Sequence, residues 1–274
     1  MTDFLKRSIS GIIFVGVLTA SVFWSQFALI ILFLLISVLG LHEYFNFFPK
    51  IDKTKPFRLI SFAVGILSYL IISLQATPYV PAVFLVIIPL LFVLLIMTFL
   101  FSHGSKPVIN AVISIAGIIY VSMPFALMTL IGKPGISTGD YQPWSIMGYF
   151  ILMWVYDVFA YLTGSLFGKH SLYPSVSPGK SWEGVIGGLV FTLIAAYPVY
   201  LLSGEFNLFH WAVIAVIIVT FGTLGDLTES RLKRQANVKD SGHILPGHGG
   251  VLDRFDGVLF NAPAVLCYIL IFAA

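Results

Sequence analysis

Nine apolar segments, separated by short polar or Pro/Gly-rich connections, make up most of this 274-residue chain. Several of them approach the ~20 consecutive apolar residues that a helix needs to cross the hydrocarbon core of a bilayer. Charged residues make up only 10% of the sequence, against about 25% in soluble domains, so the chain cannot build a fully water-exposed surface. The sequence therefore predicts an all-α, polytopic transmembrane helical bundle.

The predicted spans differ in length. The shorter ones are explained if the bilayer is thinner around them and their neighbours are tilted, or if they are partly buried in the bundle. Their boundaries are about Ile9–Trp24, Phe27–Phe48, Leu59–Leu74, Val80–Phe101, Ala111–Ile131, Met147–Gly164, Val185–Leu202, Phe209–Asp226 and Val258–Phe272.

The distribution of lysine and arginine supports this division, because cytoplasmic loops of membrane proteins are enriched in both residues. With nine spans, fourteen of the fifteen cations fall on one side of the membrane, and Lys133 alone falls on the other. This bias predicts a cytoplasmic N-terminus. The two longest polar connections, near residues 165–184 and 227–257, then face the cytoplasm. Without an internal repeat or long linker, residues 1–274 are predicted to form a single integral membrane domain.

The stretch from Asp226 to Asp256 holds five of the twelve acidic residues and five of the fifteen cations. From charge alone, a solvated cytoplasmic loop explains this density at least as well as a functional site does. If the helix continues past Asp226, Ser230 and Lys233 follow on the same face at i+4 and i+7. Asp253 and Asp256 form an i, i+3 pair before the last span. Carboxylates from two helices would suit Mg²⁺, which takes oxygen ligands and shares them with substrate phosphates.

Pro246-Gly247-His248-Gly249-Gly250 lies between these acids, and its glycines permit close approach of backbone N–H groups to an anion. Nearby lysine and arginine side chains would bind further phosphate oxygens. This combination is typical of phosphoryl or nucleotidyl transfer, which requires charge neutralisation on phosphate oxygens. His248 suits a phosphate contact or proton carrier as well as it suits a structural hydrogen-bonding role.

The order of these residues also resembles a known signature. Ser230-Arg231-Leu232-Lys233-Arg234 is followed by Lys239-Asp240-Ser241-Gly242 and then by Leu245-Pro246-Gly247-His248-Gly249-Gly250-Val251-Leu252-Asp253-Arg254-Phe255-Asp256. The pattern is similar to that of CDP-diacylglycerol synthases, also called phosphatidate cytidylyltransferases. The resemblance implies transfer of CMP from CTP to phosphatidic acid, giving CDP-diacylglycerol and pyrophosphate for phospholipid biosynthesis. It also implies dependence on Mg²⁺, with a second metal ion as an open alternative.

The resemblance further implies metal binding by Asp226 and Asp253, with Asp256 and Asp240 as supporting residues. The expected catalytic residues are Asp226, Lys233, Arg234, Lys239, Asp240, His248, Asp253, Arg254 and Asp256. The expected substrate-binding residues are Ser177, Lys180, Ser181, Glu183, Ser230, Gly249, Gly250 and Asp157. The metal ligands among them are Asp226, Asp253 and Asp256.

The other polar connection contains Ser177-Pro178-Gly179-Lys180-Ser181-Trp182-Glu183-Gly184, which resembles a family segment that more often reads Ser-Pro-Lys-Lys-Thr followed by Glu-Gly. Gly179 stands where a second lysine is common, so Lys180 is the expected phosphate contact. Gly179-Lys180-Ser181 is not a P-loop, because Pro174 occupies the position of its first glycine.

Two acids lie within or near predicted spans, where an ionisable group is costly and is a functional candidate by default. Asp157 is favoured as functional, whereas Glu43 suits a functional and a structural role equally. A transporter that uses both acids as ion-coupling sites is the alternative outside the enzymes. Transporter sites lie near the middle of the membrane, whereas the polar residues here gather on one face. A cytidylyltransferase or kinase for another lipid phosphate or alcohol is a further alternative.

The protein is expected in the bacterial inner membrane with its active site facing the cytoplasm, and no feature favours nucleic-acid binding. Similar enzymes form dimers, so a homodimer is expected. Cys267 is the single cysteine and cannot form an intrachain disulfide.

Overall fold

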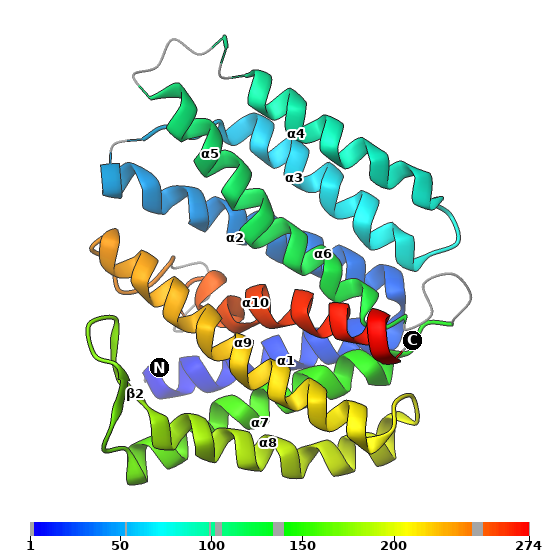
Figure 1. Ribbon diagram of the computed structural model, residues 1–274, viewed down its shortest axis with the longest axis vertical. Coiled ribbons are helices and arrows are strands. Elements are labelled where there is room, and N and C mark those ends of the chain that lie inside the picture. The colour runs from blue at the N-terminus through cyan, green and yellow to red at the C-terminus, as the bar shows by residue number, and fades with distance from the viewer. Residues whose placement is uncertain are drawn as a thin grey trace. The chain divides into compact units, whose positions relative to one another are not determined.

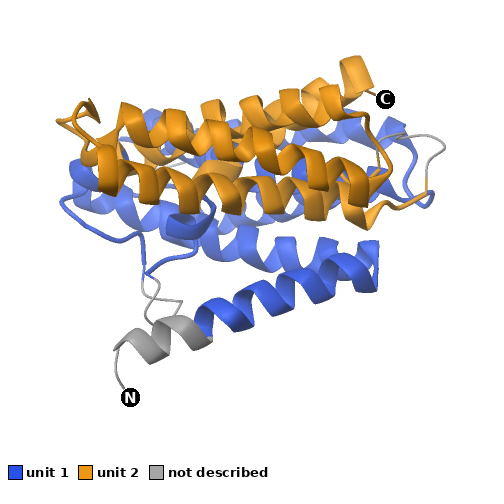
Figure 2. Ribbon diagram, turned by 90° about the horizontal axis from the view of Figure 1, so that it is seen from below, with its two compact units in different colours: residues 1–130, 232–255 blue, residues 131–231, 256–274 orange. Residues whose placement is uncertain are grey.

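The computed structural model describes residues 3–52, 54–98, 100–101, 106–133, 140–242 and 249–273. It divides into two compact units, coloured separately in Figure 2. Unit 1 contains residues 1–130 and 232–255, and unit 2 contains residues 131–231 and 256–274. The prediction of a single domain is not tested by this division and stays a prediction.

Unit 1 is built from helices that begin and end at the polar breaks of the sequence (Figure 1). Every backbone polar group inside a bilayer needs an intramolecular partner, and a helix provides one for each residue. The elements are α1 (Asp3–Trp24), α2 (Gln26–Asp52), α3 (Arg58–Ser73), η1 (Leu74–Ala76), η2 (Ala82–Val86), α4 (Ile87–Met97), α5 (Pro107–Gly117), η3 (Ile118–Ser122) and α6 (Met123–Leu130). The last three form one continuous apolar helix.

Unit 2 contains α7 (Pro143–Phe167), β1 (Ser171–Tyr173), β2 (Ser177–Ser181), α8 (Trp182–Ser203), most of α9 (Leu208–Gln235), most of α10 (Leu252–Tyr268) and η4 (Ile269–Ala273). Helices α7 and α8 lie side by side, and the antiparallel β1–β2 hairpin extends beyond their ends (Figure 1). Glycines allow this close packing: a Cβ on Gly188 would lie 2.7 Å from the ring of Tyr156.

The predicted all-α membrane architecture is confirmed. Among the described residues, seven helices are long and apolar enough to cross a membrane, and two shorter apolar helices cover Ser10–Trp24 and Ala82–Met97. Together they coincide with the nine predicted segments. The count of nine spans and the cytoplasmic N-terminus stay predictions.

The helix boundaries differ from the predicted ones beside the two polar connections. Helix α9 continues to Gln235, and α10 begins at Leu252, so the connection between them is shorter than residues 227–257. In the other connection the chain forms the β1–β2 hairpin, which the apolar pattern did not predict. Hydropathy marks where a chain enters lipid, whereas a helix continues beyond that point as long as its backbone bonds are made.

Candidate active site

The signature residues of unit 1 are organised around the carboxylate of Asp253, in the first turn of α10. Lys233 Nζ donates to Asp253 Oδ1 at 2.7 Å, and both side chains are largely buried. The backbone N–H groups of Ser241 and Gly250 each donate to Asp253 Oδ2 at 2.8 Å. Asp253 therefore joins α9, α10 and the connecting segment through charge-assisted hydrogen bonds, which are the strong kind.

Glu43 supports the same turn from α2 and is only 2% exposed. Its Oε1 accepts from the N–H of Val251 at 3.0 Å, and its Oε2 accepts from the N–H of Leu252 at 2.9 Å. The hydroxyl of Ser241 lies 3.0 Å from Glu43 Oε2 and 2.9 Å from Asp253 Oδ2. A carboxylate from a distant helix thus caps the start of α10, where N–H groups lack helical partners. These contacts favour the structural role of Glu43 over an ion-coupling role.

Phe255, inside the signature, anchors the same turn in the aromatic core of unit 1. Its ring centroid lies 5.3 Å from that of Phe125, 5.5 Å from that of Phe14 and 6.1 Å from that of Phe33, all in edge-to-face arrangements. This geometry is the favourable one for aromatic pairs. The polar signature residues are therefore carried by a turn whose apolar side is packed in place.

A second cluster lies in unit 2 and brings Lys180 together with Asp226. The Lys180 ammonium forms an ion pair with Asp226 Oδ2, and the Ser230 hydroxyl donates to Asp226 Oδ1 at 3.3 Å. Asp256 interacts electrostatically with Asp226, with the fully buried Glu229 and with Lys180. Three carboxylates and one ammonium thus share one region. Sequence reasoning had assigned no role to Glu229, although its position three residues after Asp226 places it one turn further along α9.

Glycines bring α9 and α10 close together beside this second cluster. A Cβ on Gly225 would lie 3.3 Å from the Cα of Gly257 and closer still to the carbonyl oxygen of Asp256. A Cβ on Gly257 would lie 3.5 Å from the Cα of Gly222. Small residues at such crossings are the usual means of close helix approach in membranes. These glycines were not among the predicted site residues, although the i, i+3 spacing of Gly222 and Gly225 indicates a helix face that allows close approach.

The hairpin residues have well-defined structural contacts. Ser181 caps α8, because its hydroxyl oxygen accepts from the Gly184 N–H at 3.1 Å. Glu183 accepts from the backbone N–H groups of Lys169 and His170 at 3.2 Å each, and its Oε1 lies 2.5 Å from His170 Nδ1. Both residues therefore hold the hairpin that carries Ser177 and Lys180. Their predicted substrate contacts stay predictions.

Asp157 is exposed and lies on α7, a helix that is long and apolar enough to cross a membrane. It interacts electrostatically with Tyr149 and Tyr156. The hydroxyl of Tyr156 lies 2.5 Å from that of Thr223 on α9 and also interacts with the charge of Asp226. Asp157 is thus connected to the second cluster through Tyr156.

The other predicted residues are placed as follows. Arg234, Lys239, Asp240 and Arg254 are exposed. Gly249 has a φ of 82°, the left-handed conformation that favours glycine, and Gly250 is buried. His248 lies outside the described residues.

The predicted metal ligands fall in two clusters. Asp226 and Asp256 belong to the second, and their oxygen donors fit a hard cation such as Mg²⁺. The Lys180 ammonium already provides Asp226 with a positive partner. The part of the chain that the structure describes contains no arrangement of three or more His, Cys, Asp or Glu side chains suited to a metal ion. A metal shared by Asp226 and Asp253 stays a prediction.

Comparison with known proteins identifies the family. The sequence profile described as "Cytidylyltransferase family" matches residues 5–272, nearly the entire chain. The chain belongs to this family. A protein named phosphatidate cytidylyltransferase from Staphylococcus saprophyticus is 40% identical over 179 residues. Proteins of the same name from Staphylococcus haemolyticus and Haemophilus influenzae are 52% and 48% identical over 116 and 120 residues.

The alignments cover only part of each cytidylyltransferase. The first covers 65% of this chain and 65% of its relative, whereas the other two cover 42% of this chain and 44% and 41% of their relatives. Membership of the family confirms the resemblance seen in the signature of α9 and α10. The names of the relatives describe those proteins.

Proposed function

We propose that this chain transfers CMP from CTP to phosphatidic acid and so forms CDP-diacylglycerol and pyrophosphate. The observation that carries the proposal is the largely buried pair of the signature residues Lys233 and Asp253, which joins α9 to α10 in a chain that belongs to the cytidylyltransferase family. The names of the relatives support phosphatidate as the acceptor. The proposed place is the inner membrane, with the site facing the cytoplasm.

The reaction requires little covalent chemistry from the protein. A phosphate oxygen of phosphatidate, already anionic near pH 7, attacks the α-phosphorus of CTP, a new P–O bond forms, and the bond to pyrophosphate breaks. The protein has to bring two polyanions together and to stabilise the charge on the leaving group. Lys180 and Lys233 are two cations that the structure fixes beside carboxylates, and they would bind phosphate oxygens.

The divalent cation is part of the proposal. Asp226 and Asp256, and from the signature Asp253, would hold Mg²⁺, which neutralises charge on phosphate oxygens when it is bound. Glu43 and Phe255 do not need to touch substrate, since their contacts hold the turn that carries Asp253. A homodimer stays a prediction.

An assay with defined substrates tests this proposal. Purified protein in detergent, supplied with Mg²⁺, phosphatidic acid and labelled CTP, is expected to form labelled CDP-diacylglycerol with one equivalent of pyrophosphate. Parallel reactions with diacylglycerol and with an isoprenoid phosphate distinguish the alternative acceptors. A folded sample that makes no product from phosphatidic acid, or makes more from another acceptor, would contradict the proposal.

A further inference from the structure

A cavity of about 730 Å³ opens in unit 1 beside the end of α2. It is lined by residues of the last turns of α2, by Arg58 at the start of α3 and by the segment Val238–Gly242, which contains signature residues. Its volume lies in the range of ~300–1,000 Å³ that is typical of small-molecule sites. Apart from Glu43, the residues of its α2 and α3 walls were not among the residues that the sequence singled out.

The charges that line this cavity favour an anion. Lys50 and Lys239 line it, and neither ammonium group forms an ion pair or hydrogen bond with another described residue. The Arg58 guanidinium donates one hydrogen bond, from Nη2 to the carbonyl oxygen of Phe45 at 2.8 Å, and this bond holds the side chain in place. Of the two acids in the lining, Glu43 is already engaged by backbone N–H groups, which leaves Asp240.

The cavity adjoins the residues of unit 1 that are organised around the Asp253 carboxylate. Ser241 lines the cavity, and its backbone N–H donates to Asp253, the partner of Lys233. An anion in the cavity would therefore lie against the segment that holds the signature carboxylate. The amide of Asn46, also in the lining, offers both a hydrogen-bond donor and an acceptor, which the edge of a cytosine base requires.

We propose that this cavity binds the nucleoside triphosphate, with its phosphates on Lys50, Arg58 and Lys239 and its base toward Asn46. The cations come from three separate segments of the chain, which suits a row of phosphates better than a single lipid phosphate. The inference rests on the proposed function, in which the nucleotide is CTP.

Substitution of Lys50 tests the site, with Lys55 as a matched control. Both lysines are exposed, Lys50 in the last turn of α2 and Lys55 in the connection that follows it, but only Lys50 lines the cavity. Lys50→Gln is expected to raise the KM for CTP about tenfold, the effect of losing one charge-assisted hydrogen bond. The KM for phosphatidic acid and the kcat should stay within about twofold of the wild type. Lys55→Gln should leave all three values unchanged.

Calorimetric titration of CTP into the detergent-solubilised protein, without lipid, gives a second readout. The expected result is weaker binding by Lys50→Gln and unchanged binding by Lys55→Gln. An unchanged KM and affinity for CTP in Lys50→Gln would overturn the inference. A rise in the KM for phosphatidic acid alone would also overturn it and assign the cavity to the lipid headgroup. Wild-type protein that binds CTP but forms no product would contradict the proposed function. The comparison of CTP affinity between wild type and Lys50→Gln would still test whether the cavity binds the nucleotide.

Discussion

At the scale of single residues, Asp226 and Asp253 differ in how tightly the protein holds them. The Asp226 side chain is 37% exposed, whereas that of Asp253 is 9% exposed and accepts from Lys233 and two backbone N–H groups. If both acted only as metal ligands, asparagine at either position would leave the fold intact. The contacts of Asp253 change that expectation, because removing one partner of a buried ion pair leaves the other charge uncompensated.

We therefore expect Asp226→Asn and Asp253→Asn to abolish turnover with different effects on stability. Asp253→Asn should lower the free energy of unfolding by about 3 kcal/mol. Asp226→Asn should change it by less than about 1 kcal/mol, because its ion pair is half-exposed. Product formation and denaturant unfolding in detergent measure the two effects. Normal turnover in either variant would remove that residue from the proposed chemistry, and equal stability losses would contradict the difference in burial.

Glu43 gives a second prediction at this scale. Glu43→Gln replaces one acceptor oxygen by an NH₂ group that faces N–H donors at the start of α10, so it should lower the free energy of unfolding by about 2 kcal/mol. It should also reduce kcat more than the KM for either substrate, because the turn that carries Asp253 is no longer held. Glu205→Gln, outside the helices, is the control and should behave as wild type. Unchanged kcat in a destabilised Glu43→Gln protein would limit Glu43 to a role in folding.

At the scale of elements, the crossing of α9 and α10 determines how close Asp226 and Asp256 lie. Gly225→Ala would place a methyl group against the backbone of Asp256 and Gly257, where no flexible side chain can give way. Overpacking of this kind costs about 1–3 kcal/mol. The variant should lose both stability and turnover, measured by thermal unfolding and by product formation.

Gly16→Ala is the matched control for this substitution, since a Cβ on Gly16 of α1 would meet nothing within 4 Å. Alanine in an exposed helix position should raise stability by about 0.5–1 kcal/mol and leave turnover unchanged. A Gly225→Ala protein with wild-type stability would mean that the two helices can separate without cost.

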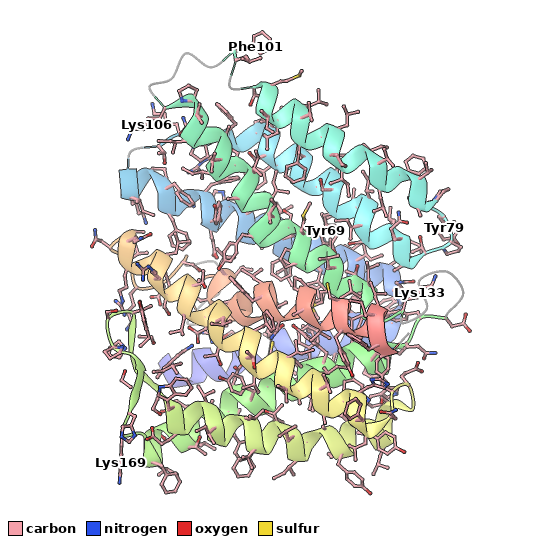
Figure 3. The ribbon with its side chains drawn as sticks, in the orientation of Figure 1. Tyr69, Tyr79, Phe101, Lys106, Lys133 and Lys169 are labelled. Carbon is pink, nitrogen blue, oxygen red and sulfur yellow. The ribbon has the colours of Figure 1, made fainter. Side chains whose placement is uncertain are left out.

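At the scale of the whole molecule, the membrane topology can be followed at the labelled residues of Figure 3. Within unit 1, Lys106 and Tyr79 lie at opposite ends of the helices, and within unit 2 Lys169 and Lys133 lie at opposite ends of α7 (Figure 3). Each unit therefore has one end that the cation bias assigns to the cytoplasm. Both assignments come from the positive-inside rule, which acts on loops during insertion.

Cysteine labelling tests this topology in a Cys267→Ser background. Lys106→Cys and Lys169→Cys should react with a membrane-impermeant maleimide only when the cytoplasmic face is accessible, as in inverted vesicles. Tyr79→Cys and Asp140→Cys should react only from the opposite face. Labelling of either pair from both faces, or of its two members from different faces, would contradict the nine-span arrangement.

The sequence by itself determined the helical membrane architecture and the chemistry of the signature. Long apolar runs leave the backbone no alternative to helices in lipid, and the order of acids, cations and glycines was specific enough to indicate the cytidylyltransferase family. Helix periodicity also placed Ser230 beside Asp226, and the structure confirms this contact at 3.3 Å.

Only the tertiary structure decided which partners these residues have. Glu43 and Ser241 are separated by 198 positions, and no local pattern indicates that Glu43 caps the start of α10. The same is true of the Lys180–Asp226 pair, the burial of Glu229 and the cavity beside α2. Such contacts depend on how helices cross and pack, whereas composition and periodicity report only which face of each helix is apolar.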